Sequence, residues 1–183
     1  MTKRETVLMT RTNGFKSLMG RRERDHLWDL AQSIPDKGLA IEIGTWLGSS
    51  AFILAEVCKQ KNARLICIDL FNYDLHGQSE WKGVDPELMS RVFHNLKDYP
   101  IHYFTGESQK IVKYLQNNIA DFIFIDGDHH LPGVKIDIES YWDKLKTGGL
   151  YCGHDYDSLE IKEAVDNFLG PVNVNRTIWS KVK

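Results

Sequence analysis

The sequence predicts an α/β fold with a doubly wound, Rossmann-like, mostly parallel sheet and helices on both faces. Short apolar runs typical of buried strands alternate with segments of helical spacing along the chain, and this alternation favours βαβ units. A glycine turn joins the first of these strands to the helix that follows it. Polar residues follow every strand, at the edge where an open parallel sheet binds its ligands.

The N-terminal half is expected to hold a leading helix and two strand–helix units. The leading helix rests on apolar residues at helical spacing, and Pro35 to Gly38 end it. Ser49 and Ser50 are cap candidates for the second helix, and Pro86 suits the first position of the third. The elements expected here are a helix over 23–34, a strand over 39–43, a helix over 49–58, a strand over 64–69 and a helix over 86–96.

The C-terminal half continues the same alternation. A glycine pair at Gly148–Gly149 is expected to close a helix that ends near Leu145. The tail has strand-like residues and is expected to pair at a sheet edge. The elements expected here are strands over 101–104, 120–126 and 150–153, helices over 108–117, 131–145 and 158–169, and an edge strand within 172–182.

Length and composition predict one domain over residues 1–183, with residues 1–38 as an N-terminal helical cover. The formal net charge of −2 gives no reason to expect nucleic acid or an anionic membrane as a partner. No apolar run approaches the ~20 residues of a membrane span, and no signal-peptide pattern opens the chain, so we expect a cytoplasmic protein. The three cysteines lack a Cys-x-x-Cys pair and are expected to be reduced core residues.

The residues after the strands indicate a functional cleft, because the carboxyl ends of parallel strands meet at one edge. They are Glu42 and Gly44 after the first strand, Asp69 after the second, Ser108 and Gln109 after the third, Asp126, Asp128 and His129 after the fourth, and His154 and Asp155 after the fifth. Glycines at 44 and 48 let the backbone approach a ligand. Asp69 lies about 20 residues beyond the glycine turn, where an acidic residue can accept both hydroxyls of a ribose.

Asp126, Asp128, His129, His154 and Asp155 form a candidate metal or acid–base cluster. Aspartate and histidine can hold a hard cation while leaving positions open for water. Asp126 and Asp155 are the best ligand pair, with His154 as the third ligand. A hydrogen-bonded polar network without metal is the alternative.

Residues 39–170 resemble the class I S-adenosylmethionine (SAM)-dependent methyltransferases. Within that class they resemble the small-molecule O-methyltransferases of the macrocin, novobiocin and catechol type. The run 42–50 is similar to their Glu-x-Gly-x-x-x-Gly-x-Ser turn, and 106–109 resembles the Gly-x-Ser-Gln segment of catechol methyltransferases. The resemblance implies SAM as cofactor, with its methionine part at the turn, its ribose at Asp69 and its adenine at Ser108 and Gln109. The cofactor-binding residues it implies are Glu42, Gly44, Thr45, Gly48, Ser50, Asp69, Ser108, Gln109 and Asp126.

The segment Asp126-Gly127-Asp128-His129 resembles the Asp-Gly-Asp-His signature of one branch of this class. In its metal-dependent members, the positions of Asp126, His154 and Asp155 hold a divalent cation such as Mg²⁺ or Mn²⁺. His129 stands where the catechol enzymes have a lysine base, and a histidine can remove a proton near neutral pH. The resemblance therefore implies Asp126 and His129 as catalytic residues.

The expected reaction is in-line transfer of the SAM methyl group to a small-molecule acceptor, at a hydroxyl whose pKa a bound metal lowers or whose proton His129 removes. The segment 71–84 could cover the acceptor, and the short N-terminal extension suggests a homodimer or a closing segment. Two alternatives are a catalytically silent protein that binds a nucleotide-like ligand, and a metal-dependent hydrolase. The lack of a Gly-x-Gly-x-x-Gly turn counts against a nicotinamide dehydrogenase.

Overall fold

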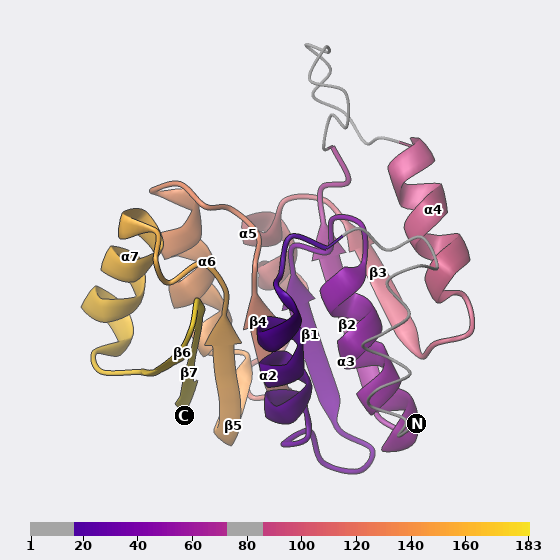
Figure 1. Cartoon of the computed structure of the whole chain (residues 1–183), viewed down its shortest axis with the longest axis horizontal. Helices are drawn as coiled ribbons and strands as arrows, with labels where there is room; N and C mark the ends of the chain where they lie inside the picture. The colour runs from indigo at the N-terminus through magenta and orange to yellow at the C-terminus, as the bar shows by residue number, and fades with distance from the viewer. Residues whose placement is uncertain (1–16, 73–85) are drawn as a thin grey trace.

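The computed structural model describes residues 17–72 and 86–183. Its strands and helices alternate along the chain, as the sequence predicts (Figure 1). In chain order they are α2 (Arg21–Ala31), β1 (Leu39–Ile43), α3 (Ser49–Gln60), β2 (Arg64–Asp69), α4 (Pro86–Leu96), β3 (Ile101–Thr105), α5 (Ser108–Ile111), the 3₁₀ turn η2 (Val112–Tyr114), β4 (Ala120–Ile125), α6 (Gly133–Trp142), β5 (Leu145–Gly153), α7 (Leu159–Leu169), β6 (Asn173–Asn175) and β7 (Ile178–Val182).

The sheet has seven strands in the order β3-β2-β1-β4-β5-β7-β6. The first five in this order pair in parallel, whereas β7 runs antiparallel to β5 and β6 runs antiparallel to β7. This arrangement confirms the predicted mostly parallel, Rossmann-like sheet and the predicted pairing of the C-terminal tail. The strand order reverses between β1 and β4, and ligands of such sheets bind in the crevice outside the carboxyl ends at that point.

Helices cover both faces of the sheet, because alternate residues of each strand point to opposite sides. Ala40 of β1 belongs to a core formed with α2, α3 and α4. The next residue, Ile41, belongs to a second core formed with α5, α6 and α7. Figure 1 shows α2 and α3 together on one side of the strands. Among the described residues, no helix has the length and apolarity that a membrane span needs.

The structure corrects the expected boundary between the helix predicted over 131–145 and the strand predicted over 150–153. The helix expected to reach Leu145 ends at Trp142, and β5 begins at Leu145 instead of Leu150. Gly148 has φ +82 within β5, and its N–H donates to the carbonyl of Lys183 at 2.9 Å. Pairing with the C-terminal residues thus overrides the turn propensity of the glycine pair, and the register with β4 shifts at this point.

Two further local predictions were wrong. Neither Ser49 nor Ser50 caps α3, because the cap is Gly48, which has φ +83 and provides no side-chain hydrogen bond. The helix expected over 108–117 is the short α5 followed by η2, and the chain becomes extended at Leu115. Residues 1–16 of the expected N-terminal cover, and 73–84 of the expected acceptor cover, lie outside the described residues.

Candidate active site

The β1–α3 loop lies directly against the end of β4. Gly44 has φ +86, and a Cβ atom at this position would lie 1.9 Å from the backbone carbonyl oxygen of Asp126. The backbone N–H of Asp126 donates to Ile43 at 2.8 Å. Glycine is therefore required at position 44 for the loop to reach the strand that carries the Asp126 side chain.

Asp69, at the end of β2, holds the same loop from the other side. Its Oδ2 atom accepts hydrogen bonds from the backbone N–H groups of Thr45 at 2.5 Å and Trp46 at 2.8 Å. Its Oδ1 atom accepts one from Phe71 at 2.6 Å. Asp69 therefore fixes the loop, in addition to the predicted ribose contact, which stays a prediction.

Glu42 lies fully buried beneath the loop. It accepts a 3.0 Å hydrogen bond from the Thr45 hydroxyl and a 3.4 Å bond from the Cys67 thiol, and the Ser50 side chain also bonds to it. Burial raises the pKa of Glu42 to about 7. In this structure Glu42 thus supports the loop from below, and direct contact with a cofactor stays a prediction.

Ser108 and Gln109 lie half-buried at the start of α5, after β3. The Ser108 hydroxyl donates a 2.5 Å hydrogen bond to Asp137, a buried residue of α6. Burial raises the pKa of Asp137 to about 6. The backbone carbonyl of Ser108 accepts a bond from the Tyr141 hydroxyl at 3.0 Å. Two residues of α6 thus hold the segment that was predicted to face an adenine.

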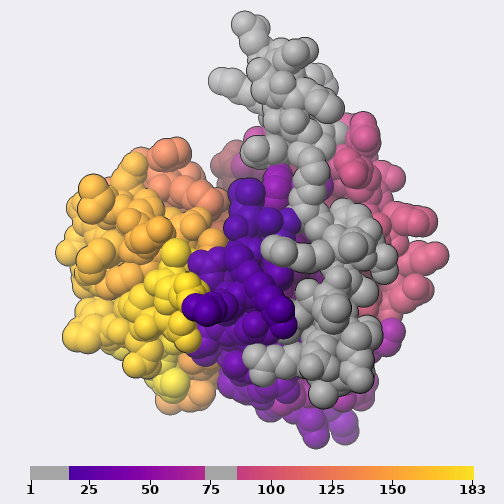
Figure 2. Space-filling view, in the orientation of Figure 1, coloured from indigo at the N-terminus to yellow at the C-terminus, as the bar shows by residue number. Residues whose placement is uncertain are grey.

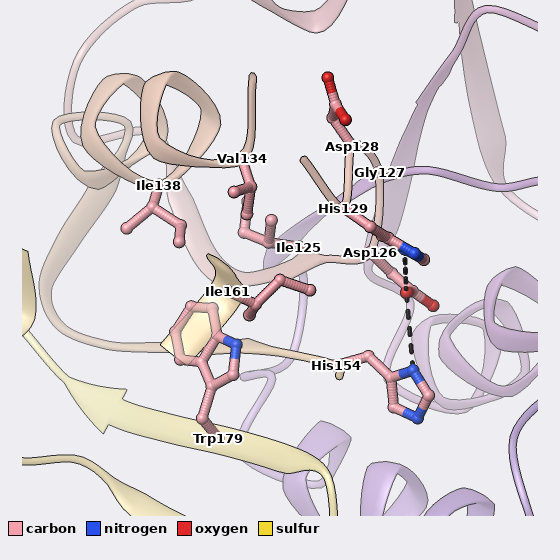
Figure 3. Close-up of a pocket in the computed structure, with 10 residues that line it drawn as sticks. All are labelled: Ile125, Asp126, Gly127, Asp128, His129, Val134, Ile138, His154, Ile161 and Trp179. Atoms are coloured by element: carbon pink, nitrogen blue, oxygen red, sulfur yellow. Dashed lines mark ion pairs between the residues drawn. The ribbon is translucent and has the colours of Figure 1, made fainter. Parts of the chain in front are cut away.

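The ends of β4 and β5 bring the predicted catalytic and metal-ligating residues together. His129 Nε2 lies 3.6 Å from Asp126 Oδ1 and 3.4 Å from Asp155 Oδ2. His154 Nδ1 lies 3.0 Å from Asp155 Oδ1 and 3.7 Å from Asp126 Oδ1. Asp155 has φ +55, a left-handed conformation that aspartate tolerates, and this bend follows directly on β5. Figure 3 shows His129 and His154 converging on Asp126 from opposite sides.

The environments of these groups differ in ways that affect their protonation. Burial raises the pKa of Asp126, while the hydrogen bond with His154 lowers that of Asp155. Contact with Asp126 raises the pKa of His129. Burial alone would lower the pKa of His154, but its contacts with the surrounding carboxylates outweigh burial and raise it to about 9.

Asp126, His154 and Asp155 offer donor atoms that all lie within 4.8 Å of one another. The prediction that Asp128 belongs to the cluster was wrong: its side chain points away (Figure 3), and its Oδ1 atom accepts a 3.0 Å hydrogen bond from the backbone N–H of His130. The cluster borders a small hollow, which is lined on its other side by Ile125, Ile161 and Trp179 (Figure 3).

A third carboxylate approaches the cluster from the N-terminal helix. Glu23 Oε1 lies 3.8 Å from His154 Nε2, the ring nitrogen on the far side from the aspartates. The Glu23 carboxylate accepts bonds from the Thr177 hydroxyl at 2.5 Å and from the Gly20 backbone N–H at 2.6 Å. In Figure 2 the first described residues, in indigo, lie beside the C-terminal residues, in yellow.

Sequence analysis missed Glu23 and Asp137. Asp137 carried a readable signal, because it lies at helical spacing with the buried residues Val134, Ile138 and Tyr141. Glu23 fits the N3 position of a capping box that begins at Gly20, but its approach to His154 depends on how α2 packs on the sheet.

Comparison with known proteins agrees with this architecture. A family model described as a methyltransferase domain matches residues 41–156. That range contains the glycine loop, Asp69, Ser108 and the cluster at the ends of β4 and β5.

Several solved structures share the fold at low sequence identity. A TDP-rhamnose 3'-O-methyltransferase of calicheamicin biosynthesis has a TM-score of 0.64 at 16% identity, covering 100% of this chain and 87% of that chain. An SAH-bound methyltransferase from Podospora anserina has a TM-score of 0.64 at 15% identity, covering 99% of this chain and 86% of that chain. A putative caffeoyl-CoA O-methyltransferase from Staphylococcus aureus has a TM-score of 0.66 at 15% identity, covering 100% of this chain and 93% of that chain. Because the family model matches well over half of the chain, this protein belongs to the methyltransferase-domain family.

Proposed function

We propose that this protein transfers the methyl group of SAM to a hydroxyl of a small-molecule acceptor. The observation that carries the proposal is the contact between the Gly44 loop and the end of β4. This contact brings the loop predicted to bind the cofactor beside the Asp126 and His129 side chains, so that donor and acceptor could meet there.

The similar structures support this chemistry. The TDP-rhamnose 3'-O-methyltransferase and the putative caffeoyl-CoA O-methyltransferase are, by their names, enzymes that act on oxygen. The Podospora methyltransferase was solved with SAH bound. These likenesses favour the O-methyltransferase branch and a SAM cofactor for the present chain.

His129 is the residue that we propose as general base. Its side chain is 48% exposed, and its Nε2 atom lies near both Asp126 and Asp155. An acceptor hydroxyl could therefore reach the ring from solvent, while the two carboxylates stabilise the imidazolium that forms when the ring takes a proton.

Asp126, His154 and Asp155 fit a divalent cation, because one nitrogen and two carboxylate groups converge within 4.8 Å. Mn²⁺ and Mg²⁺ accept carboxylate oxygen, and Mn²⁺ also suits imidazole. A cation held by these residues would polarise the acceptor hydroxyl and favour loss of its proton.

A coupled assay tests the proposal. The purified protein is incubated with SAM, Mn²⁺ and a panel of sugars and phenols, and methylated products are detected by mass spectrometry. We expect Asp126→Asn to abolish product formation, while Asp143→Asn, an exposed residue just beyond α6, retains it. Equal turnover by wild type and Asp126→Asn would exclude the proposed site. If EDTA abolishes activity and Mn²⁺ restores it, the result supports the proposed cation. If activity is unchanged in EDTA, the cation takes no part in the reaction and His129 is the base.

A further inference from the structure

His154 is held between carboxylates on both sides of its ring. Nδ1 faces Asp155 at 3.0 Å and Asp126 at 3.7 Å, while Nε2 faces Glu23 at 3.8 Å. The ring is 9% exposed, and Nε2 is buried without a hydrogen-bond partner among the described residues. In Figure 3 one ring nitrogen points toward Asp126 and the other points away from it. Glu23 is thus the carboxylate nearest the far side of the ring.

Glu23 is itself fixed in place by two independent bonds. The Thr177 hydroxyl, just before β7, donates to Oε1, and the Gly20 backbone N–H donates to Oε2. One of these bonds closes the N-terminal turn of α2, and the other ties α2 to the C-terminal hairpin. The Glu23 side chain is only 14% exposed. A carboxylate held this firmly can impose an orientation on the ring that it faces.

We propose that Glu23 is a positioning residue that turns His154 Nδ1 toward Asp126 and Asp155. A histidine that ligates a metal commonly donates its other ring N–H to a carboxylate, which fixes the tautomer and the ring orientation. Glu23 occupies the place of that carboxylate. This inference rests on the proposed function, because Asp126, His154 and Asp155 are the cation ligands proposed there.

The N-terminal helix therefore contributes to the site as well as covering the sheet. Glu23 lies outside the range 41–156 that the family model matches, and it reaches a site built from β4 and β5. The Thr177 hydroxyl donates to Oε1 of Glu23, the same carboxylate oxygen that faces His154. We therefore expect substitution of Thr177 to weaken the site in the same direction as substitution of Glu23.

Titration of the full-length protein with Mn²⁺, followed by electron paramagnetic resonance of the free ion, tests the inference. We expect Glu23→Ala to raise the Mn²⁺ dissociation constant roughly 10–100-fold, the usual effect of removing such a partner. Glu23→Gln keeps one acceptor oxygen and is expected to lose less. Thr177→Val removes the hydroxyl without changing the charge or the helix cap, and should weaken binding as well. Asp25→Asn removes a carboxylate from the same helix and should bind Mn²⁺ as wild type does.

A second measurement separates this inference from the proposed function. Crystal structures of wild type and Glu23→Ala without metal show whether the His154 ring has turned. If wild type binds Mn²⁺ and Asp155→Asn does not, but Glu23→Ala binds equally well, the positioning role is wrong and the cation site stands. If wild type binds no Mn²⁺, the cation site is wrong, and the Glu23→Ala structure decides the rest. A turned ring supports the positioning role, and an unchanged ring overturns it.

Discussion

Asp69 accepts a 2.5 Å hydrogen bond from the backbone N–H of Thr45, so the end of β2 fixes the loop that follows β1. A second bond from Trp46 reaches the same carboxylate oxygen at 2.8 Å. Hydrogen bonds to a charged group contribute about 1.5–3 kcal/mol each. The conformation of the proposed cofactor loop therefore depends on a side chain from a different strand.

Replacement of Asp69 should impair cofactor binding. Asp69→Ala removes both loop bonds and the proposed ribose acceptor, so we expect S-adenosylhomocysteine to bind roughly tenfold more weakly or worse, which is a loss of at least about 1.4 kcal/mol. Isothermal titration calorimetry measures the change. Asp121→Asn is a matched control, because Asp121 also accepts a hydrogen bond from a backbone N–H group, that of Leu39, but at the opposite end of the strands. An Asp69→Ala protein that binds as wild type does would show that Asp69 takes no part in the cofactor site.

Substitution of Gly44 should disrupt the contact between the loop and β4. A Cβ atom there would lie 1.9 Å from Asp126 backbone oxygen, in a conformation with φ +86. Gly148 has a similar φ of +82, but a Cβ atom there would meet nothing within 4 Å. Gly148→Ala should therefore lower the free energy of unfolding by only about 1–2 kcal/mol. Chemical denaturation should therefore find Gly44→Ala clearly less stable than Gly148→Ala, and calorimetry should find its cofactor binding lost. Similar behaviour of the two variants would argue against a close loop–strand contact.

Activity should rise with pH if His129 is the general base. Contact with Asp126 raises the pKa of His129 above its ordinary value of 6.5, so the ring is mostly protonated at pH 6.5 and becomes mostly neutral only at higher pH. The profile of kcat/KM should therefore fall as the pH drops through a pKa above 6.5. His129→Gln should lower kcat roughly 10²–10⁴-fold and remove this limb of the profile. His102→Gln, an exposed residue of β3, should leave the profile unchanged, and a His129→Gln enzyme with an unaltered profile would assign the base elsewhere.

Glu42 should make the native state less stable as the pH rises toward neutrality. Its pKa is raised from 4.5 to about 7 by burial, so between these values the native state binds more protons than the unfolded state. The free energy of unfolding then falls with rising pH, by roughly 3 kcal/mol for this group. Glu42→Gln lacks this contribution, so its stability relative to wild type should increase by that amount from pH 4.5 to 8.

Urea unfolding of both proteins across this pH range gives the Glu42 contribution as a difference, which cancels groups that titrate in both. Glu163→Gln, an exposed residue of α7, should show a constant difference from wild type. A constant difference for Glu42→Gln as well would mean that Glu42 titrates alike in the folded and unfolded states.

Much of the fold could be read from the sequence, because local pattern and tertiary pairing agree there. The bounds of β1 and β2 match the prediction, since both are apolar runs bounded by turn residues. The start of β5 could not be read, because Gly148 pairs with Lys183, a residue far away in the sequence. Residues carried on strand ends converge as predicted, because parallel pairing places those ends at one edge. Glu23 reaches the cluster only through the packing of α2 beside β7, which no local pattern encodes.

Calorimetric titration with S-adenosylhomocysteine in Mn²⁺ buffer tests the central claim most directly. The proposed function predicts saturable binding of one ligand per chain, with the heat greatly reduced in Asp69→Ala and Gly44→Ala and retained in Asp121→Asn and Gly148→Ala. Absence of binding to folded wild-type protein would contradict SAM-dependent methyl transfer at this site.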